Sequence, residues 1–238
     1  MQKIRFFFSN QMFNPTWIGV FVNPFFIARR GLMKVIAQLS PNLSGRLLDV
    51  GCGRKPYEKL FQVDEYIGLD IDSERTRAEA KADFLYDGQK FPFEAGSFDS
   101  ILCNQVLEHV FNPEEFIKEI HRVLKPNGVI ILTVPFMWDE HEQPFDYARY
   151  SSFGLKALIE KNGFIIEKQK KINPNLAAIF QLFICYFYKF LPKPLIIRLI
   201  INAIIFAPIS LLGIVLGKLL PNNQNLYLDQ IILAKKTP

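Results

Sequence analysis

The sequence predicts an α/β fold built around a mainly parallel sheet. Short apolar segments alternate with helical segments between residues 46 and 104, and this alternation is typical of parallel strands joined by helices. Residues 47–53 join an apolar strand to a glycine turn, and a second strand, residues 66–70, ends in the carboxylate Asp70. Glycines let a backbone approach a ligand closely, and a carboxylate about 20 residues further on accepts hydrogen bonds from a ribose. The pattern therefore indicates a nucleotide-like ligand at one edge of the sheet.

Local signals define the helices. Residues 25–39 form a basic amphipathic pattern that Ser40-Pro41-Asn42 ends. Asn112-Pro113 and the two glutamates after them are typical of a helix start, and apolar residues at helical spacing continue that helix to about residue 124. Ser151 caps a further helix, which ends before Gly163. The other predicted helices are 56–62 and 73–80, and the predicted strands are 46–50, 66–70, 82–86, 98–103, 129–134, 164–170 and 226–235.

Charge is strongly segregated along the chain. Residues 1–48 contain six basic side chains and no acid, residues 49–167 contain 13 basic and 22 acidic side chains, and residues 168–228 contain seven basic side chains and no acid. The basic residues of both flanks are scattered among phenylalanine, isoleucine and leucine rather than clustered. This distribution favours an anionic membrane surface as partner and argues against nucleic acid.

The segment 172–225 is an apolar insert between the last two predicted strands. Residues 199–217 are 19 residues without a charge, which as a helix approach the thickness of a hydrocarbon core. If the flanking strands pair in one sheet, both ends of the insert lie on the same side of any bilayer, which excludes a single crossing. A re-entrant hairpin, an interfacial pair of helices, and a helical subdomain that buries itself or forms a homodimer are the alternatives. The predicted domains are a basic cap (1–44), a ligand-binding domain (45–171 with 226–238) and this insert.

The cysteine pattern indicates a reducing compartment. Cys52, Cys103 and Cys185 are an odd number without CxxC or Cys/His spacing, so neither a disulfide framework nor a zinc site is predicted. The apolar run after Arg5 is too short for a secretory signal. We expect a cytoplasmic protein, held at the inner face of the cell membrane by the flanks.

A series of ordered motifs carries a resemblance to a known family. The motifs are Leu48-Asp49-Val50-Gly51-Cys52-Gly53, Asp70, Asp87-Gly88-Gln89-Lys90-Phe91-Pro92-Phe93, Ser97-Phe98-Asp99, Val106-Leu107-Glu108-His109-Val110 and Arg122-Val123-Leu124-Lys125-Pro126-Asn127-Gly128. With these motifs in this order and at these intervals, the chain resembles the class I S-adenosylmethionine (SAM)-dependent methyltransferases of the type 11 group, over residues 45–171 and 226–238. The resemblance implies a Rossmann-like seven-strand sheet, mainly parallel with an antiparallel last strand, to which this chain adds an N-terminal helix and the apolar insert.

The expected cofactor is SAM. The third glycine of the dinucleotide fingerprint is missing after Gly53, which favours a ligand with an adenosine ribose but no pyrophosphate. By the resemblance, Asp70 would bind the ribose hydroxyls, with Asp72 as the alternative, and Asp87 would meet the adenine, with Asp83 or a loop-capping role as alternatives. The expected SAM-binding residues are Asp49, Gly51, Cys52, Gly53, Asp70, Ile71, Asp87, Gly88, Asn104 and Gln105.

Two residues are candidates for catalysis. His141 follows the fifth strand in a segment rich in charged and aromatic residues, where an imidazole could remove a proton from an acceptor. Tyr147 could shape the pocket and face the methylsulfonium. His109 is interpreted as a structural residue behind the fourth strand. No metal is expected to take part.

The resemblance implies methyl transfer to a hydroxyl or another nucleophile. The segment 135–150 resembles a bacterial subgroup associated with cell-surface glycan or lipid-linked pathways, and an amphiphilic acceptor would explain the apolar cationic flanks. The expected partner is a small or lipid-linked acceptor, with membrane contact through residues 172–225. The alternatives are a noncatalytic, SAM-binding membrane adaptor and a dinucleotide oxidoreductase.

Overall fold

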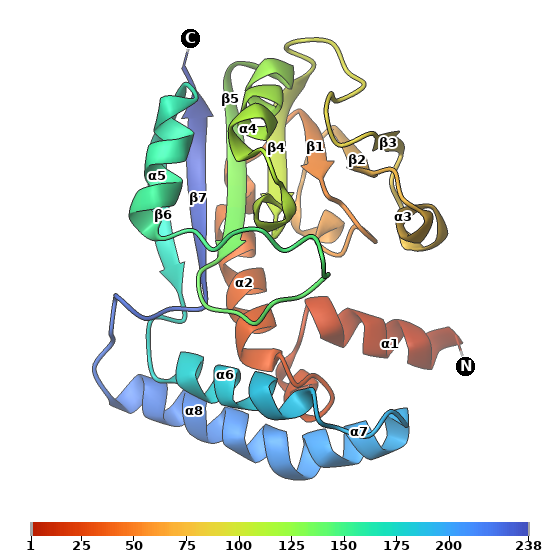
Figure 1. Cartoon of the computed structure of the whole chain (residues 1–238), viewed down its shortest axis with the longest axis vertical. Coiled ribbons are helices and arrows are strands. Elements are labelled where there is room, and N and C mark those ends of the chain that lie inside the picture. Colours follow the sequence, from red (N-terminus) through yellow and green to blue (C-terminus); the bar gives the residue numbers. More distant parts are fainter. Residues whose placement is uncertain (1, 238) are drawn as a thin grey trace. The chain divides into compact units, whose positions relative to one another are not determined.

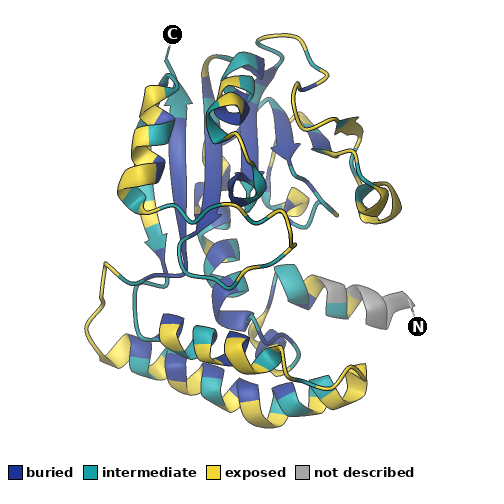
Figure 2. Ribbon diagram, in the orientation of Figure 1, coloured by how far each residue is buried: buried dark blue, intermediate teal, exposed yellow. Residues whose placement is uncertain are grey.

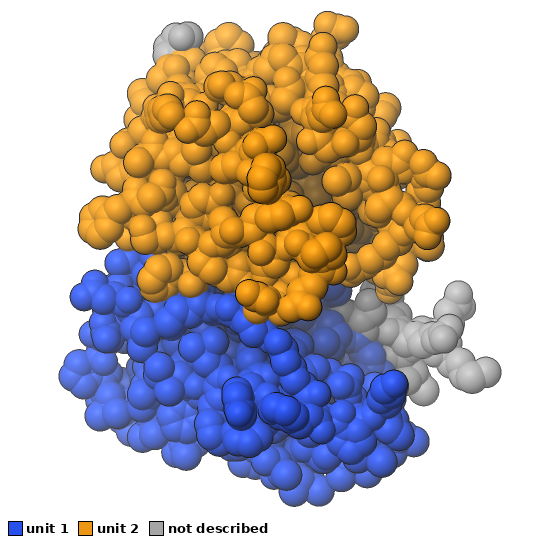
Figure 3. Space-filling model, viewed as in Figure 1, with its two compact units in different colours: residues 1–35, 137–139, 171–229 blue, residues 36–136, 140–170, 230–238 orange. Residues whose placement is uncertain are grey.

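The structure is a computed structural model that describes residues 2–237, without the side chains of residues 2–6 and 9. The chain divides into two compact units, which Figure 3 colours separately. Unit 1 comprises residues 1–35, 137–139 and 171–229, and unit 2 comprises residues 36–136, 140–170 and 230–238. The boundaries at residues 45, 172 and 226 that the sequence suggests stay a prediction.

Seven strands form one sheet in the order β3-β2-β1-β4-β5-β7-β6 (Figure 1). The neighbours β1–β2, β2–β3, β1–β4 and β4–β5 are parallel, and β7 is antiparallel. The predicted Rossmann-like seven-strand sheet is therefore confirmed. The strands are β1 Arg46–Val50, β2 Glu65–Ile71, β3 Phe84–Tyr86, β4 Phe98–Asn104, β5 Leu124–Pro135, β6 Phe164–Ile172 and β7 Asp229–Lys236.

The central strands form the core of unit 2. Strands β1, β4, β5 and β7 consist largely of buried residues, which Figure 2 shows in dark blue. A sheet covered on both faces needs such nearly continuous apolar runs rather than an alternating pattern. The helix α4 (Pro113–Val123) adds Phe116, Ile117, Ile120 and Val123 to this core.

The strand order reverses between β1 and β4. After β1 the chain adds β2 and β3 on one side, and then returns to place β4 on the other side. Val50, the last residue of β1, lies opposite Leu69 of β2 and Cys103 of β4, so the three carboxyl ends share one edge. In open α/β sheets, ligands bind outside the strand ends at such a reversal.

The helices of unit 2 follow the predicted pattern with one exception. α3 (Glu74–Glu79) is capped by Ser73, α4 begins after Asn112, and α5 (Ser152–Lys161) is capped by Ser151, whose Oγ accepts from the Gly154 N–H at 3.1 Å. The predicted helix at 56–62 is wrong. Only the 3-10 turn Glu58–Leu60 (η3) forms, because Phe61, the residue after it, has an extended backbone with a φ of −108° and a ψ of 133°. Tyr57 and Phe61, which flank the turn, are buried without a longer helix.

The starts of β5 and β7 differ most from those predicted. β5 begins at Leu124 rather than 129, because residues 125–128 bulge out of the strand between the pairs Phe98–Leu124 and Ser100–Val129. β7 begins at Asp229 rather than 226, because the preceding residues still form a turn, in which the Leu226 N–H donates to the Asn223 carbonyl.

Unit 1 consists of helices. They are α1 Gln2–Phe13, the 3-10 turn η1 Trp17–Phe21, the first part of α2 Phe26–Leu39, α6 Ala177–Tyr188, α7 Leu195–Ile201, the π-helical turn η5 Asn202–Phe206 and α8 Ala207–Leu219. The sequence predicts α2 and the apolar helices but not α1. From Leu195 to Leu219 the helix is continuous over 25 residues. By length and composition it is long and apolar enough to cross a membrane.

Buried amides hold the helices of unit 1 together. Gln181 of α6 is fully buried, and its Oε1 accepts hydrogen bonds from the Ile27 and Ala28 N–H groups at 3.1 and 3.3 Å. Its Nε2 donates to the Pro24 carbonyl at 2.9 Å. Gln181 thus satisfies N–H groups in the first turn of α2 that have no partner within the helix.

Candidate functional site

The turn after β1 lies in contact with Asp70, so two predicted ligand-binding groups, the glycine turn and this carboxylate, are neighbours. Gly51 and Gly53 have φ values of +70° and +49°, a region that favours glycine. The Gly53 N–H donates to Asp70 Oδ2 at 2.8 Å, and the Ile71 N–H donates to Asp70 Oδ1 at 2.8 Å. The end of β2 therefore lies directly against the glycine turn.

The turn leaves room for a ligand beside Gly53. A Cβ atom on Gly53 would meet no atom within 4 Å, whereas a Cβ on Gly51 would collide with the Val106 side chain. Each Asp70 oxygen accepts one backbone hydrogen bond and can accept another. Burial raises the pKa of Asp70, and the two backbone hydrogen bonds oppose this rise. Open backbone next to an acceptor-only group fits the ribose of an adenosyl ligand.

Asp49 and Cys52 point into the protein. Asp49 is 4% exposed, and the Tyr66 hydroxyl donates to its Oδ2 at 2.6 Å. Burial raises the pKa of Asp49 to about 7, the Tyr66 hydrogen bond opposes the rise, and the charge of Asp70 adds to it. The Cys52 side chain is buried as well, and burial raises the pKa of its thiol.

Tyr66 is a partner of Asp49 that the sequence analysis missed. Asp49 lies opposite Gly68 in the neighbouring strand β2. Residues two apart in a strand share a face, so Tyr66 and Gly68 point to the same side. The sequence signal for this contact was available: Tyr66 lies two residues before Gly68, the glycine that pairs with Asp49.

Asp87 follows β3 and caps the loop there. Its Oδ1 accepts from the Gln89 N–H at 2.9 Å and the Lys90 N–H at 3.4 Å, which is the loop-capping role left open by the sequence. A Cβ atom on Gly88 would lie 3.5 Å from Ile71 Cδ1, so the loop after β3 lies next to the end of β2. An adenine-binding role for Asp87 and Gly88 stays a prediction.

The two alternative carboxylates are held by basic side chains. Asp83 accepts from Lys55 Nζ at 2.5 Å and from the Gly68 N–H at 2.7 Å. Asp72 forms a two-bond ion pair with Arg77. Asp70, which contacts the turn, is therefore the better ribose candidate.

Asn104 and Gln105 are fixed at the end of β4 by Thr133 of β5. Thr133 Oγ1 donates to Asn104 Oδ1 at 2.8 Å, and the Gln105 N–H donates to the Thr133 carbonyl at 3.1 Å. Gln105 has a φ of +56°, so the chain turns sharply after the strand. Both residues lie at the edge of the sheet that carries the glycine turn.

The loop after β5 holds His141 and Tyr147. His141 Nδ1 lies 3.2 Å from Asp146 Oδ2, and its backbone N–H donates to the same oxygen at 2.9 Å. Burial opposes ionisation of Asp146, but hydrogen bonds from Arg149 and His141 outweigh it and lower the pKa to about 2. The Tyr147 ring packs edge-on against Phe111 at 5.3 Å. The catalytic roles of His141 and Tyr147 stay predictions.

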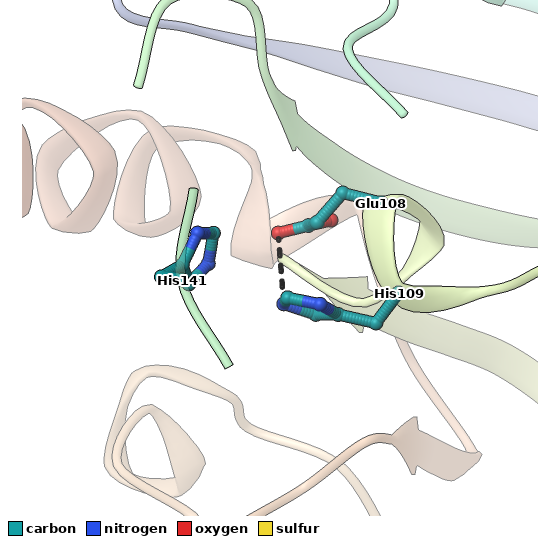
Figure 4. A group of neighbouring side chains, drawn as sticks. All are labelled: Glu108, His109 and His141. Carbon is teal, nitrogen blue, oxygen red and sulfur yellow. Dashed lines mark ion pairs between the residues drawn. The ribbon is translucent and has the colours of Figure 1, made fainter. Parts of the chain in front are cut away.

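His109 lies against His141 rather than behind β4. The two ring centroids are 4.8 Å apart, and Glu108 lies next to them (Figure 4). His109 Nδ1 is 2.8 Å from the Phe145 carbonyl oxygen. The interpretation of His109 as a residue packed behind the strand is corrected, because the loop after β5 supplies its contacts.

Fold and site together define a class of protein. The sheet has a strand-order reversal, a glycine turn after its first strand and a carboxylate at the end of its second strand. These features define a Rossmann-like protein that binds an adenosine-containing ligand. A family model described as a methyltransferase domain matches residues 27–168. The chain belongs to the class I SAM-dependent methyltransferases, and SAM is its cofactor.

Curated relatives share part of the chain. A Mycolicibacterium smegmatis protein named a "probable S-adenosylmethionine-dependent methyltransferase" is 30% identical over 148 residues, covering 56% of this chain and 57% of the relative. A ubiquinone biosynthesis O-methyltransferase of Dechloromonas aromatica is 34% identical over 101 residues, covering 37% and 43%. The chain thus matches less than two thirds of the length of either relative.

A solved structure supports the fold. A SAM-dependent methyltransferase from Archaeoglobus fulgidus superposes with a TM-score of 0.57 at 18% identity, covering 97% of this chain and 99% of that one. At this identity the likeness concerns the fold alone.

Proposed function

We propose that this chain transfers the methyl group of SAM to a hydroxyl oxygen of a small or amphiphilic acceptor. The contact between the Gly53 N–H and Asp70, next to open space at Gly53, carries the proposal. Two relatives, the ubiquinone biosynthesis O-methyltransferase and a malonyl-[acyl-carrier protein] O-methyltransferase, are named for transfer to oxygen, which supports oxygen as the accepting atom.

The residues of the chain would act mainly by positioning. When bound, SAM supplies an electrophilic methyl group on a positively charged sulfur. Asp70 and the backbone at Gly53 would hold the adenosyl part, and Asp49, once ionised, would attract the ammonium group. Asn104 and Gln105 would border the reacting end. Alignment of donor and acceptor alone can account for a large part of such a rate acceleration.

The test is a transfer assay with SAM that carries a labelled methyl group. The intact protein is incubated with extracts containing lipids, quinols and lipid-linked sugars, and products are separated and identified by mass spectrometry. The proposal expects label in a product that carries a new O-methyl group. Binding of SAM without any labelled product would instead indicate the adaptor, and label on nitrogen or carbon would overturn the choice of oxygen.

We also propose that unit 1 contacts the inner face of the cell membrane from the cytoplasm through residues 172–225. Exposed residues, coloured yellow in Figure 2, recur along the helices of unit 1, and many of them are large and apolar. Monomeric soluble proteins rarely expose a contiguous apolar patch larger than a few hundred Å². The exposed large apolar residues of this segment are Ile179, Phe183, Tyr186, Phe187, Phe190, Leu195, Ile196, Ile197, Ile200, Ile204, Ile205, Leu211, Leu212, Val215, Leu219 and Leu220.

The inward face of α8 has the opposite character. Its buried residues are the small Ala207, Ser210, Gly213 and Gly217, and Gly213 packs against Phe180 of α6. In water a helix turns its large apolar residues inward, whereas helices in membranes pack through small residues and face lipid with large ones. The basic residues Lys193 and Lys218 are exposed at the ends of α7–α8, where they would meet anionic head groups.

Flotation with liposomes tests this contact. The intact chain is mixed with vesicles of neutral or anionic phospholipid, and we expect it to float with the anionic ones. A variant carrying Ile204→Gln and Leu212→Gln changes only exposed side chains and is expected to float several times less. Intact protein that stays in the soluble fraction with anionic vesicles would overturn the proposal.

A further inference from the structure

Three side chains of unit 2 that commonly ligate metals converge near the end of β4. Glu108 and His109 lie in the 3-10 turn Leu107–His109 (η4), and His141 comes from the loop after β5 (Figure 4). One donor atom from each lies within 4.8 Å of the others, and His109 Nε2 is 3.8 Å from Glu108 Oε1. Ligands about 2.0–2.2 Å from a tetrahedral zinc are roughly 3.3–3.6 Å apart. Small side-chain rotations would therefore complete such a geometry.

Hydrogen bonds orient both imidazoles. His109 Nδ1 lies 2.8 Å from the Phe145 carbonyl oxygen. Because a carbonyl only accepts, Nδ1 carries a proton, and in the neutral imidazole Nε2 then carries the lone pair. His141 Nδ1 lies 3.2 Å from Asp146, whose carboxylate Arg149 holds with bonds of 2.5 and 2.6 Å. Histidines that bind metals commonly give one N–H to a carbonyl or carboxylate and present the other nitrogen to the ion.

The two segments that supply the ligands are fixed to each other. The Glu108 carbonyl accepts hydrogen bonds from the Tyr147 and Ala148 N–H groups at 2.8 and 3.2 Å. The Glu108 side chain is fully buried, so its carboxylate has little conformational freedom. The two segments that carry the donor atoms are therefore held next to each other before any ion binds.

We propose that Glu108, His109 and His141 bind a divalent transition-metal ion, with Zn²⁺ as the reference. Two imidazoles and one carboxylate suit zinc and its first-row neighbours, whereas Mg²⁺ prefers oxygen ligands and water. The sequence predicts no metal because His141 is distant along the chain, and only the fold brings it to the Glu108–His109 pair. Three protein ligands leave a position for an acceptor oxygen, a role that rests on the proposed function.

Metal titration of the intact protein tests the site. The protein is stripped with a chelator and titrated with Zn²⁺ by calorimetry, with Co²⁺ by visible absorption, and with Mg²⁺ for comparison. We expect one Zn²⁺ per chain, a Co²⁺ spectrum that Zn²⁺ abolishes, and no comparable binding of Mg²⁺. Glu108→Gln and His141→Ala should each weaken Zn²⁺ binding more than tenfold. Asp146→Asn, which removes the charge beside His141, should weaken it by about 10-fold.

His121 provides the matched control. It is the one histidine of the sequence outside the proposed site, and it packs against Phe164. His121→Gln should therefore leave the affinity for Zn²⁺ unchanged. No binding of Zn²⁺ or Co²⁺ by the unaltered protein, or binding lost in His121→Gln but kept in Glu108→Gln, would overturn the proposal. SAM binding is measured separately on the same stripped protein, so failure of the metal site and failure of the proposed function give different results.

Discussion

Asp49 is a carboxyl whose ionisation the fold changes strongly. Burial, helped by the charge of Asp70, raises its pKa to about 7, against roughly 3.9 for an ordinary aspartate. Between about pH 4 and 7 the folded protein therefore binds more protons than the unfolded chain, and the free energy of unfolding falls as the pH rises through this range.

Asp49→Asn should remove this pH dependence. The amide oxygen can still accept from Tyr66, and no charge has to be buried. Because each tenfold change in an acid dissociation constant is worth about 1.4 kcal/mol and the pKa of Asp49 is raised to about 7, we expect the variant to be more stable above pH 7 by up to about 4 kcal/mol. The difference should shrink toward pH 4. Urea unfolding at several pH values measures it, with the exposed Asp64→Asn as control. An unchanged pH dependence in Asp49→Asn would contradict the assignment.

Gly53 and Gly96 offer a matched pair of substitutions. Both have a positive φ, and a Cβ atom on either would meet nothing within 4 Å. Changing each to alanine should cost a similar stability, on the order of 1 kcal/mol, because of the backbone conformation. Only Gly53→Ala should also weaken SAM binding, by more than tenfold, because its Cβ would enter the proposed ligand space. Equal SAM affinity in the two variants would count against a ligand at Gly53.

At the scale of elements, the bounds of helices and strands are predicted well where they depend on neighbouring residues and poorly where they depend on contacts between distant residues. The helix starts after Asn112 and Ser151 are confirmed, because the signals for them, Pro113 in the first turn of α4 and the cap Ser151 of α5, lie next to the helices that they begin. The predicted helix at 56–62 was wrong because the chain becomes extended at Phe61, directly after the turn Glu58–Leu60, and Tyr57 and Phe61 are buried without a helix. The start of β5 was misplaced because the residues before the bulge pair with Phe98 of another strand, which no local pattern reveals.

The packing of α6 on α8 depends on a small residue at Gly213. A Cβ atom there would lie 2.6 Å from Phe180 Cβ, so Gly213→Ala should destabilise unit 1 by about 1 to 2 kcal/mol despite the better helix propensity of alanine. Gly154 of α5 is exposed, and its nearest neighbour to such an atom is at 3.4 Å. Gly154→Ala should therefore stabilise by up to about 1 kcal/mol. Thermal unfolding followed by circular dichroism compares them, and a gain in stability for Gly213→Ala would contradict the packing.

At the scale of the molecule, the resemblance to a known family predicts the seven-strand sheet, and the apolar strand before residues 51–53 predicts the position of the glycine turn. Asp70 could be placed at the turn because both follow strand ends. The meeting of His141 with Glu108 and His109 could not be predicted, because the conformation of a long loop depends on contacts such as the Asp146–Arg149 pair. Unit 1 likewise gathers the N-terminal segment and the insert, which lie far apart in the sequence.

The most direct test of the account is a calorimetric titration with SAM and, separately, with NAD. We expect one SAM per chain, no displacement by NAD, and at least tenfold weaker SAM binding in Asp70→Asn. Asp72→Asn should bind SAM like the unaltered protein, because Asp72 is an exposed acid paired with Arg77. Failure to bind SAM at millimolar concentration, or a loss of binding in Asp72→Asn but not in Asp70→Asn, would contradict the assignment of this turn as the SAM site.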